Sequence, residues 1–320
     1  MRVLFRADGG EIADISTGHI YRALRIADYL QNSVSEVLFC SLSKPEFELG
    51  WNIISSKQHP VVVGNADQLR KHAILFRPDV VFLDQYIYEQ NELEFFHSIA
   101  KKCIFTFDDP GAKLSERHCQ INALIHNTST TPALREIVLP IPRLKPKSFG
   151  RPKKIFVSFG GHDHNCIMDR VLKILTNTEY ELDIVCVPPS RHIVSDDILT
   201  TAKGTLLRVY VSPPNFDELL SECDFAITSG GLTFFQCLSE QLVTLALAQY
   251  PHQEAALVAL EYTKAFKYIG LANTISDDVL RAEIISFITD DKEIERISNN
   301  VKLLEVGAGF KTINNMLNIQ

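Results

Sequence analysis

The feature that most constrains this chain is a regular alternation of short apolar runs with longer amphipathic stretches. In the first half, residues 3–5, 36–42, 61–63, 79–84 and 102–107 have the length and composition of buried strands. Helical spacing of apolar residues lies between them, as over residues 20–30, 66–76 and 89–100. Buried strands that alternate with helices favour a parallel sheet covered by helices on both faces. The sequence therefore predicts an α/β fold, with a last strand of this half at 121–125.

The alternation starts again after a break. Residues 139–153 contain four prolines and several basic residues without periodicity, which is typical of a linker. Strands are then predicted at 155–159, 182–187, 206–211, 224–228 and 242–247, with Asn215 as the cap of a helix over 216–222. Three helical stretches are expected to end the chain, the last near 310–317 folding back on the first half. We predict two Rossmann-like domains, residues 1–145 and 146–320, with strand ends facing across a cleft.

Composition limits the class of protein. The 320 residues are 46% hydrophobic, which is enough for two cores, and no apolar run approaches the roughly 20 residues that span a bilayer. We expect a soluble, cytoplasmic protein without membrane insertion. The net charge of −7 argues against a nucleic-acid partner. Seven cysteines without a Cys-x-x-Cys pair predict buried thiols and no zinc site.

The loop after the first strand carries candidate chemistry. It holds Arg6, Asp8, Gly10 and Gly18 and leads into a helix that begins near His19. A glycine-bearing loop before a helix presents backbone N–H groups and the positive end of the helix dipole to an anion. The same dipole disfavours the imidazolium form and keeps His19 available as a neutral base. The alternative is ordinary: the glycines serve only the turn, and His19 caps the helix.

Two further glycine pairs, Gly160-Gly161 and Gly230-Gly231, follow strands of the second half. Such turns let a backbone approach a ligand closely, and three of them fit a ligand that carries a diphosphate. Neither Gly-x-Gly-x-x-Gly nor Gly-x-x-x-x-Gly-Lys-Ser/Thr occurs, so NAD binding and P-loop nucleotide hydrolysis lose support. A tight turn with a helix cap is the alternative at 229–233.

The order of motifs resembles a known family. The motifs are Arg6-x-Asp8, Gly18-His19-x-x-Arg22, Asp84-x-Tyr86, Asp108-Asp109, Phe159-Gly160-Gly161-x-Asp163 with Asn165, and Ser229-Gly230-Gly231-x-Thr233. Together they resemble the UDP-2,4-diacetamido-2,4,6-trideoxy-β-L-altropyranose hydrolases of pseudaminic acid biosynthesis. That family is similar to spore-coat polysaccharide proteins of the SpsG type and shares the GT-B fold with the MurG glycosyltransferases.

The resemblance implies a hydrolase that cleaves the anomeric C–O bond of a UDP-sugar to give UDP and free sugar. It implies that His19 is catalytic and that Tyr86 lies beside the reacting centre, and we predict His19, Tyr86 and Asp84 as the catalytic residues. It also implies that the second half holds the diphosphate and uridine, through Gly160, Gly161, Ser229, Gly230, Gly231 and Thr233. The remaining motif residues, Arg6, Asp8, Gly10, Gly18, Arg22, Asp109, Asp163 and Asn165, are taken as substrate-binding.

Some positions depart from the family pattern. Gln236 stands where related enzymes have an acidic residue for the ribose hydroxyls, and His252-Gln253 stands where an Asn-Gln pair is expected. These three residues are also predicted to contact substrate. A structural role, as a cap or turn residue, is the alternative for Asp8, Asp84 and Asp108.

Three functions stay open from the sequence. The first is a nucleotide-sugar hydrolase, the second a GT-B glycosyltransferase that uses the same donor, and the third a nucleotide-sugar binding protein without catalysis. No metal or other cofactor is predicted, because His162, Asp163 and His164 form the only suggestive group and are interpreted as loop residues. The oligomeric state is left open.

Overall fold

The computed structural model describes residues 1–10, 17–85, 87–109, 111–121, 134–147, 149, 153–163, 166–189, 192–201 and 205–318. The chain divides into two compact units. The first comprises Met1–Asn127, Arg135–Leu139 and Ala308–Gln320, and the second comprises Thr128–Leu134 and Pro140–Gly307. The C-terminal segment thus belongs to the first unit, after the chain has completed the second.

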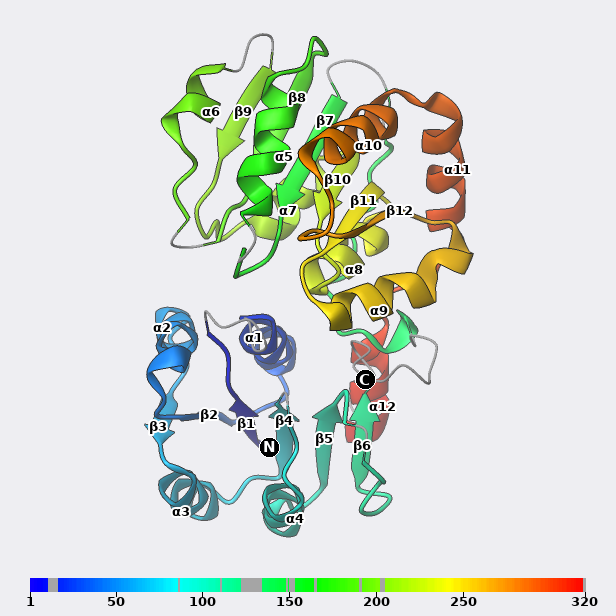
Figure 1. The fold of residues 1–320 in the computed structure, drawn as a ribbon. Helices are drawn as coiled ribbons and strands as arrows, with labels where there is room; N and C mark the ends of the chain where they lie inside the picture. The colour runs from blue at the N-terminus through cyan, green and yellow to red at the C-terminus, as the bar shows by residue number, and fades with distance from the viewer. Residues whose placement is uncertain are drawn as a thin grey trace. The chain divides into compact units, whose positions relative to one another are not determined.

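The described strands of the first unit form a six-stranded parallel sheet in the order β3-β2-β1-β4-β5-β6 (Figure 1). They are β1 (Arg2–Ala7), β2 (Glu36–Leu42), β3 (Val61–Gly64), β4 (Val80–Asp84), β5 (Cys103–Phe107) and β6 (His118–Ile121). The helices are α1 (Gly18–Leu30), α2 (Glu48–Ser56), α3 (Ala66–Phe76), α4 (Gln90–Ile99) and α12 (Gly309–Leu317). Buried residues of α1, α2 and α12 pack on one face of the sheet, and those of α3 and α4 pack on the other.

A row of aromatic rings runs across the middle of this sheet. The ring of Phe5 stacks on Phe39 at 4.8 Å and on Phe82 at 4.9 Å, and Phe82 stacks on Phe105 at 4.6 Å between centroids. These four residues are neighbours in register on β2, β1, β4 and β5. Stacked pairs add roughly 0.5–1.5 kcal/mol each beyond their burial, so the row helps to fix the register of these four strands.

The second unit repeats the arrangement. Its described strands form a six-stranded parallel sheet in the order β12-β11-β10-β7-β8-β9. They are β7 (Lys153–Ser158), β8 (Leu182–Cys186), β9 (Thr205–Val209), β10 (Phe225–Thr228), β11 (Val243–Ala248) and β12 (Lys267–Leu271). The helices are α5 (Ile167–Thr176), α6 (Asp196–Thr201), α7 (Phe216–Ser221), α8 (Leu232–Ser239), α9 (Pro251–Leu260), α10 (Asp277–Thr289) and α11 (Asp291–Val301). Short 3-10 turns are η1 (Pro45–Phe47), η2 (Leu134–Glu136) and η3 (Glu261–Thr263).

The predicted α/β class with two parallel sheets is confirmed, and several local predictions are wrong. Strand β6 ends at Ile121, where the predicted strand 121–125 begins, and residues 122–125 lie outside the described part of the chain. The sequence did not predict strand β12, which lies among the C-terminal helices. This short edge strand is only half-buried and contains Gly270, where φ is +113°, so it lacks the pattern of a buried strand. The side chain of Asn215 makes no cap hydrogen bond to α7. Cys166 is exposed, although the sequence predicted a buried thiol.

No described helix has both the length and the apolar content needed to cross a membrane.

Candidate active site

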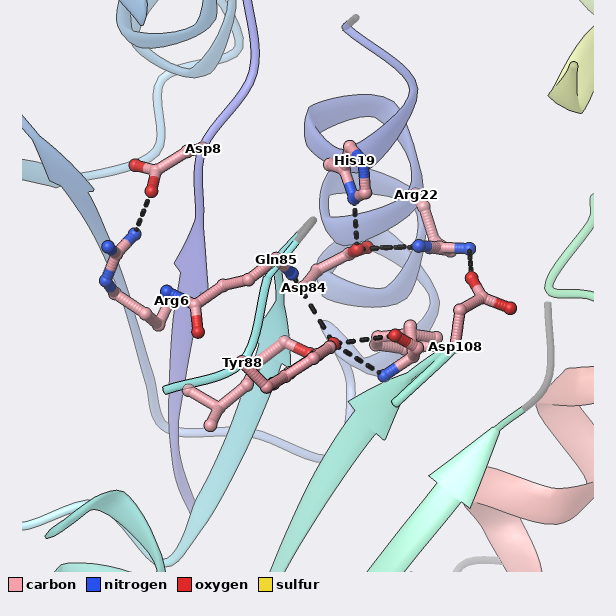
Figure 2. A network of polar contacts seen from close by, with 10 residues as sticks. Arg6, Asp8, His19, Arg22, Asp84, Gln85, Tyr88 and Asp108 are labelled. Atoms are coloured by element: carbon pink, nitrogen blue, oxygen red, sulfur yellow. Dashed lines mark hydrogen bonds and ion pairs between the residues drawn. The ribbon is translucent and has the colours of Figure 1, made fainter. Parts of the chain in front are cut away.

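A cluster of buried charged side chains lies in the first unit where β4 ends beside the first turn of α1 (Figure 2). Asp84 is the last residue of β4 and is 1% exposed. Its Oδ1 lies 2.5 Å from Nδ1 of His19 and accepts a hydrogen bond from Nη2 of Arg22 at 2.6 Å. Its Oδ2 accepts a second bond from Nε of Arg22 at 2.6 Å. His19 and Arg22 are three residues apart on α1, so they project from the same face of the helix.

The contact with Asp84 assigns the tautomer of His19. An ionised carboxylate only accepts hydrogen bonds, so the Nδ1 atom of His19 must carry the proton. In the neutral ring, Nε2 is then the nitrogen with a lone pair that can take a proton. His19 is 9% exposed. The cluster thus presents an oriented imidazole with a defined acceptor atom.

The same contacts keep the cluster ionised. Burial by itself would raise the pKa of Asp84, but the Arg22 guanidinium and His19 outweigh it and hold that pKa well below its ordinary value. Burial likewise opposes the charge on Arg22, but Asp84 and Asp108 raise its pKa. A bidentate arginine–carboxylate pair in a buried place is rigid, because both oxygens and both nitrogens are fixed by short bonds.

Asp108 extends the cluster to β5. Its Oδ2 lies 3.4 Å from Nη1 of Arg22, and the Arg22 guanidinium lies 4.5 Å from the centroid of the Phe107 ring. The backbone φ of Asp108 is +55°, in the left-handed region that aspartate tolerates better than most residues. The backbone N–H of Asp108 still donates to the carbonyl oxygen of Ile121 on β6 at 2.9 Å.

Tyr88 bridges the ends of the two strands that carry these carboxylates. Its hydroxyl lies 2.9 Å from the carbonyl oxygen of Leu83 and 2.7 Å from that of Phe107. The hydroxyl also accepts hydrogen bonds from the backbone N–H of Phe107 at 2.9 Å and of Gln85 at 3.4 Å. Figure 2 shows this hydroxyl beneath the charged cluster.

Arg6 and Asp8 belong to a separate internal network. Arg6 is 1% exposed and lies between Oδ2 of Asp8 at 2.7 Å and Oε1 of Glu92 at 2.9 Å. The other oxygen of Asp8 accepts from the Ser41 hydroxyl and from the backbone N–H of Leu42, both at 2.9 Å. These contacts join β1 to β2 and α4. We therefore leave Arg6 and Asp8 out of the proposed substrate contacts.

Two predicted glycines of the first loop, Gly10 and Gly18, lie in different surroundings. A Cβ at Gly10 would lie 1.7 Å from the carbonyl oxygen of Glu46, so this position has no room for a side chain. Gly18 is the first residue of α1. Residues 11–16 between them lie outside the described part of the chain, as do the predicted site residues Tyr86 and Asn165.

Asp109 lies beside a buried histidine. Its Oδ1 accepts from the backbone N–H of Gly111 at 2.8 Å, and its Oδ2 lies 3.8 Å from Nε2 of His118. Nδ1 of His118 accepts from the backbone N–H of Leu114 at 3.2 Å, and its Nε2 lies 2.9 Å from the hydroxyl of Thr106. Burial lowers the pKa of His118. The two side chains hold the connection between β5 and β6.

In the second unit, three strand ends meet around one carbonyl group. The carbonyl oxygen of Phe159, just after β7, accepts from Nε2 of Gln249 at 2.7 Å and from the Ser229 hydroxyl at 3.4 Å. Ser229 follows β10 and Gln249 follows β11. The next residue, Gly160, has φ of +82°, a conformation that favours glycine. The predicted glycine turn is thus anchored by neutral side chains.

Gln253 lies against the second glycine turn. Its Oε1 accepts from the backbone N–H of Gln249 at 2.9 Å. A Cβ at Gly230 would lie 3.0 Å from Leu257 and 3.1 Å from Gln253, and one at Gly231 would lie 3.9 Å from Nε2 of Gln253. The sequence predicts that Gln253 contacts substrate, and this stays a prediction.

The remaining predicted binding residues of this unit fall into two groups. Thr233 lies in the first turn of α8, and Gly161 is half-buried beside Gly160. His252 lies in the first turn of α9, with its ring stacked on Tyr250 at 5.5 Å between centroids. Asp163 and Gln236 instead make internal contacts, described next.

Asp163 caps α5. Its two carboxylate oxygens accept from the backbone N–H groups of Ile167 at 2.9 Å and Met168 at 2.7 Å. Burial raises the pKa of Asp163. Gln236 is 5% exposed, and its Nε2 donates to Asp217 at 2.8 Å, which joins α8 to α7. We therefore assign neither residue a substrate contact.

Two site-forming residues were not identified from the sequence, Tyr88 and Gln249. Each residue follows a buried strand within a few positions, and this is the sequence feature that could have identified it. Tyr86 and Gln253 also follow the same strands within a few positions, so the sequence alone does not distinguish them from Tyr88 and Gln249. In the described ranges, no three His, Cys, Asp or Glu side chains gather in a way that could hold a metal ion. The expectation of a metal-independent reaction stays a prediction.

Comparison of the sequence with known proteins gives one distant relative. No family profile matches the chain. The uncharacterized protein MJ1062 of Methanocaldococcus jannaschii is 24% identical over 281 residues, which cover 78% of this chain. The match spans 56% of that protein, so the chain corresponds to about half of its relative.

Solved structures resemble the chain over its whole length. MurG of Acinetobacter baumannii aligns with a TM-score of 0.68 and 16% identity, covering 99% of each chain. The glycosyltransferase VinC, in complex with dTDP, has a TM-score of 0.63 and 14% identity, covering 100% of this chain and 99% of its own. The rhamnosyltransferase SpnG, with spinosyn aglycone, has a TM-score of 0.58 and 14% identity, covering 98% and 100%. The fold is that of the GT-B glycosyltransferases, which confirms the predicted architecture.

Proposed function

We propose that this chain is a glycosyltransferase-type enzyme that breaks the anomeric C–O bond of a nucleotide sugar and transfers the sugar to a hydroxyl acceptor. The observation that carries the proposal is the buried contact of His19 with Asp84, which leaves Nε2 of an oriented imidazole as a base. GT-B enzymes with nucleotide-sugar donors are the structural neighbours, which favours transfer over the hydrolysis expected from the sequence. The sugar, the nucleotide base and the acceptor are to be identified by the experiment described below.

In the proposed reaction, Nε2 of His19 takes the proton of the acceptor hydroxyl as its oxygen forms a bond to the anomeric carbon. The bond from that carbon to the diphosphate oxygen breaks, and the nucleoside diphosphate leaves with the electron pair. Asp84 stabilises the imidazolium that forms, and Arg22 holds Asp84 in place. Every atom of the donor is accounted for in the glycoside and the nucleoside diphosphate.

We assign nucleotide binding to the second unit. Neutral backbone and side-chain donors gather around the turns at Gly160 and Gly230, and the N-terminus of α8 follows the second turn. A helix N-terminus with unhindered N–H groups favours a negatively charged oxygen. Ser229, Gly231, Thr233 and Gln253 are the proposed contacts of the diphosphate.

Hydrolysis is the second candidate, and the motif order of the sequence favours it. In that case water replaces the acceptor, and the products are UDP and a free diacetamido deoxy sugar of nonulosonic acid or surface polysaccharide synthesis. The same His19 would take a proton from water.

The test is to incubate the protein with UDP-, dTDP- and CMP-sugars, with and without a panel of hydroxyl acceptors, and to measure nucleotide release by chromatography. Release that requires an acceptor supports transfer, and many turnovers in water alone support hydrolysis. His19→Ala should lower either activity at least about 100-fold. His59→Ala is the matched control, because the described contact of the His59 ring nitrogens is with the exposed Asp28. Binding of a nucleotide sugar without turnover would contradict both proposals.

A further inference from the structure

The β4–β5 pairing ends just before the site. The register of these two strands runs from Val80 opposite Cys103 to Leu83 opposite Thr106. Beyond this point the next residues of the two strands are Asp84 and Phe107, and after them come Gln85 and Asp108. Backbone groups that leave a sheet in a buried place need other hydrogen-bond partners.

The hydroxyl of Tyr88 supplies those partners. It accepts from the backbone N–H of Phe107 at 2.9 Å and lies 2.7 Å from the Phe107 carbonyl oxygen and 2.9 Å from that of Leu83. The N–H of Gln85 lies 3.4 Å away. One hydroxyl has one proton to donate and two lone pairs to accept, so it can accept from both N–H groups and donate to one of the two carbonyl oxygens at a time. A side chain thus continues the link between two strands where the ladder stops (Figure 2).

Asp84 and Asp108 are the residues that this link controls. Asp84 directly follows Leu83, and Asp108 directly follows Phe107. Both carboxylates contact Arg22, Asp84 at 2.6 Å and Asp108 at 3.4 Å. The separation of the strand ends therefore sets whether one arginine can reach both carboxylates, and Asp84 in turn orients His19.

We propose that Tyr88 is a positioning residue for the reaction proposed above: its hydroxyl fixes the ends of β4 and β5 so that Asp84 holds the imidazole of His19. Tyr88 does not touch the reacting atoms in this proposal and acts through Asp84. Burial and the charge of Asp84 raise the pKa of Tyr88 well above its ordinary value, so the hydroxyl keeps its proton over the working pH range. Only the kinetic test of this inference rests on the proposed function.

The first experiment replaces the hydroxyl alone. Tyr88→Phe retains the ring, which packs against the core below α4, and removes the bridge. We expect kcat to fall roughly 10- to 100-fold while KM for the nucleotide sugar stays within about twofold, because donor binding is assigned to the other unit. Tyr29→Phe is the matched control, because that hydroxyl accepts from Asn314 on the exposed side of α1. An unchanged kcat in Tyr88→Phe would overturn the proposal.

The second experiment does not depend on activity. In proton NMR spectra, the Nδ1 proton of His19 donates to a carboxylate and should give a downfield resonance that His19→Ala removes. Tyr88→Phe should shift or broaden this resonance, and Tyr29→Phe should leave it in place. If the wild type turns over no nucleotide sugar, the proposed function fails, and this resonance still decides whether Tyr88 positions His19.

A measurement on the wild-type protein covers the case in which Tyr88→Phe does not fold. The amide proton of Phe107 is bonded to the Tyr88 hydroxyl, so it should exchange with solvent at least about 10³-fold more slowly than an exposed amide. Exchange at the rate of an exposed amide would overturn the proposal.

Discussion

The two sheets share one topology, but the groups at their strand ends have opposite character. The first unit places ionised side chains there, with Asp84 and Arg22 both 2% exposed or less. The second unit places glycines, a hydroxyl and amides at the corresponding ends, with Gln249 and Ser229 bonded to one carbonyl oxygen. The fold is the same in both, so the function of each half depends on the few residues that follow its strands.

The difference has a physical consequence for each half. Buried charges are costly unless they are paired, and the pairing makes them rigid, which suits a base that must be oriented. Neutral donors carry no counter-charge that an incoming diphosphate would have to displace. The comparison therefore predicts that charge changes disturb the first unit strongly and the second unit weakly.

The largest expected effect comes from removing the central charge of the first unit. Asp84→Asn leaves the buried Arg22 without its bidentate partner, and we expect a loss of about 3–5 kcal/mol in the free energy of unfolding. Turnover should fall roughly 10³-fold or more, because His19 loses its fixed tautomer. Denaturant unfolding and nucleotide-release assays measure the two effects.

The same substitution in the second unit is the control. Asp183 on β8 pairs with Arg208 at 2.6 Å, but the side chain of that arginine is 41% exposed. Asp183→Asn should cost less than about 1 kcal/mol, since solvent screens exposed pairs. Equal losses in the two variants would remove the contrast between the units.

A second prediction separates chemistry from binding. His19→Ala should lower turnover at least about 100-fold and change the dissociation constant of the nucleoside diphosphate less than about twofold. Gly231→Ala should do the reverse and weaken nucleotide binding roughly 10-fold, because a methyl group there meets no described side chain closer than 3.9 Å and stands free to obstruct a ligand. Calorimetric titration with UDP and dTDP measures the binding. A His19→Ala variant that loses affinity as strongly as turnover would assign both roles to the first unit.

The third prediction concerns pH. The pKa of Asp84 lies below its ordinary value in the folded protein, so its contribution to stability is present above about pH 4 and is lost as pH falls toward the folded value. Burial raises the pKa of Asp163, so its contribution is present below about pH 4 and is lost as pH rises through the folded value. As pH rises from about 2, the free energy of unfolding that Asp84→Asn loses relative to wild type should grow by at least about 1 kcal/mol. The loss caused by Asp163→Asn should shrink over the same range. Urea unfolding at stepped pH measures both, and parallel slopes would contradict the assignment.

How far the sequence predicts this molecule depends on the range of the interaction. The strand–helix alternation is local, so β2 and α3 were predicted with the residues that the structure gives them, Glu36–Leu42 and Ala66–Phe76. The helix α2, which buries Gly50 and Ile54, was not predicted from the sequence. The spacing of His19 and Arg22 is also local, and in the structure both side chains reach Asp84 from α1.

Contacts across the sheet could not be predicted in this way. Arg6 was predicted to contact substrate, and the sequence could not indicate its bond to Glu92, which lies 86 residues away on α4. Tyr88 and Tyr86 are two residues apart after the same strand, and only the path of the chain decides which hydroxyl reaches the β5 backbone. Gln249 reaches the Phe159 carbonyl across 90 positions. Local pattern thus gives the elements, whereas the identity of the site residues follows from strand order.

The smallest predicted effect tests whether the second unit relies on backbone conformation where the first relies on charge. Gly160 has φ of +82°, and nothing lies within 4 Å of where its Cβ would be, so Gly160→Ala adds strain without a clash. We expect a loss of about 1 kcal/mol in the free energy of unfolding, measured in urea. Gly160→Asn should lose less than the alanine variant, because asparagine tolerates positive φ better. If the alanine and asparagine variants have the same stability, or if neither differs from wild type, the turn does not depend on this backbone conformation. The two sheet edges would then differ in their side chains alone.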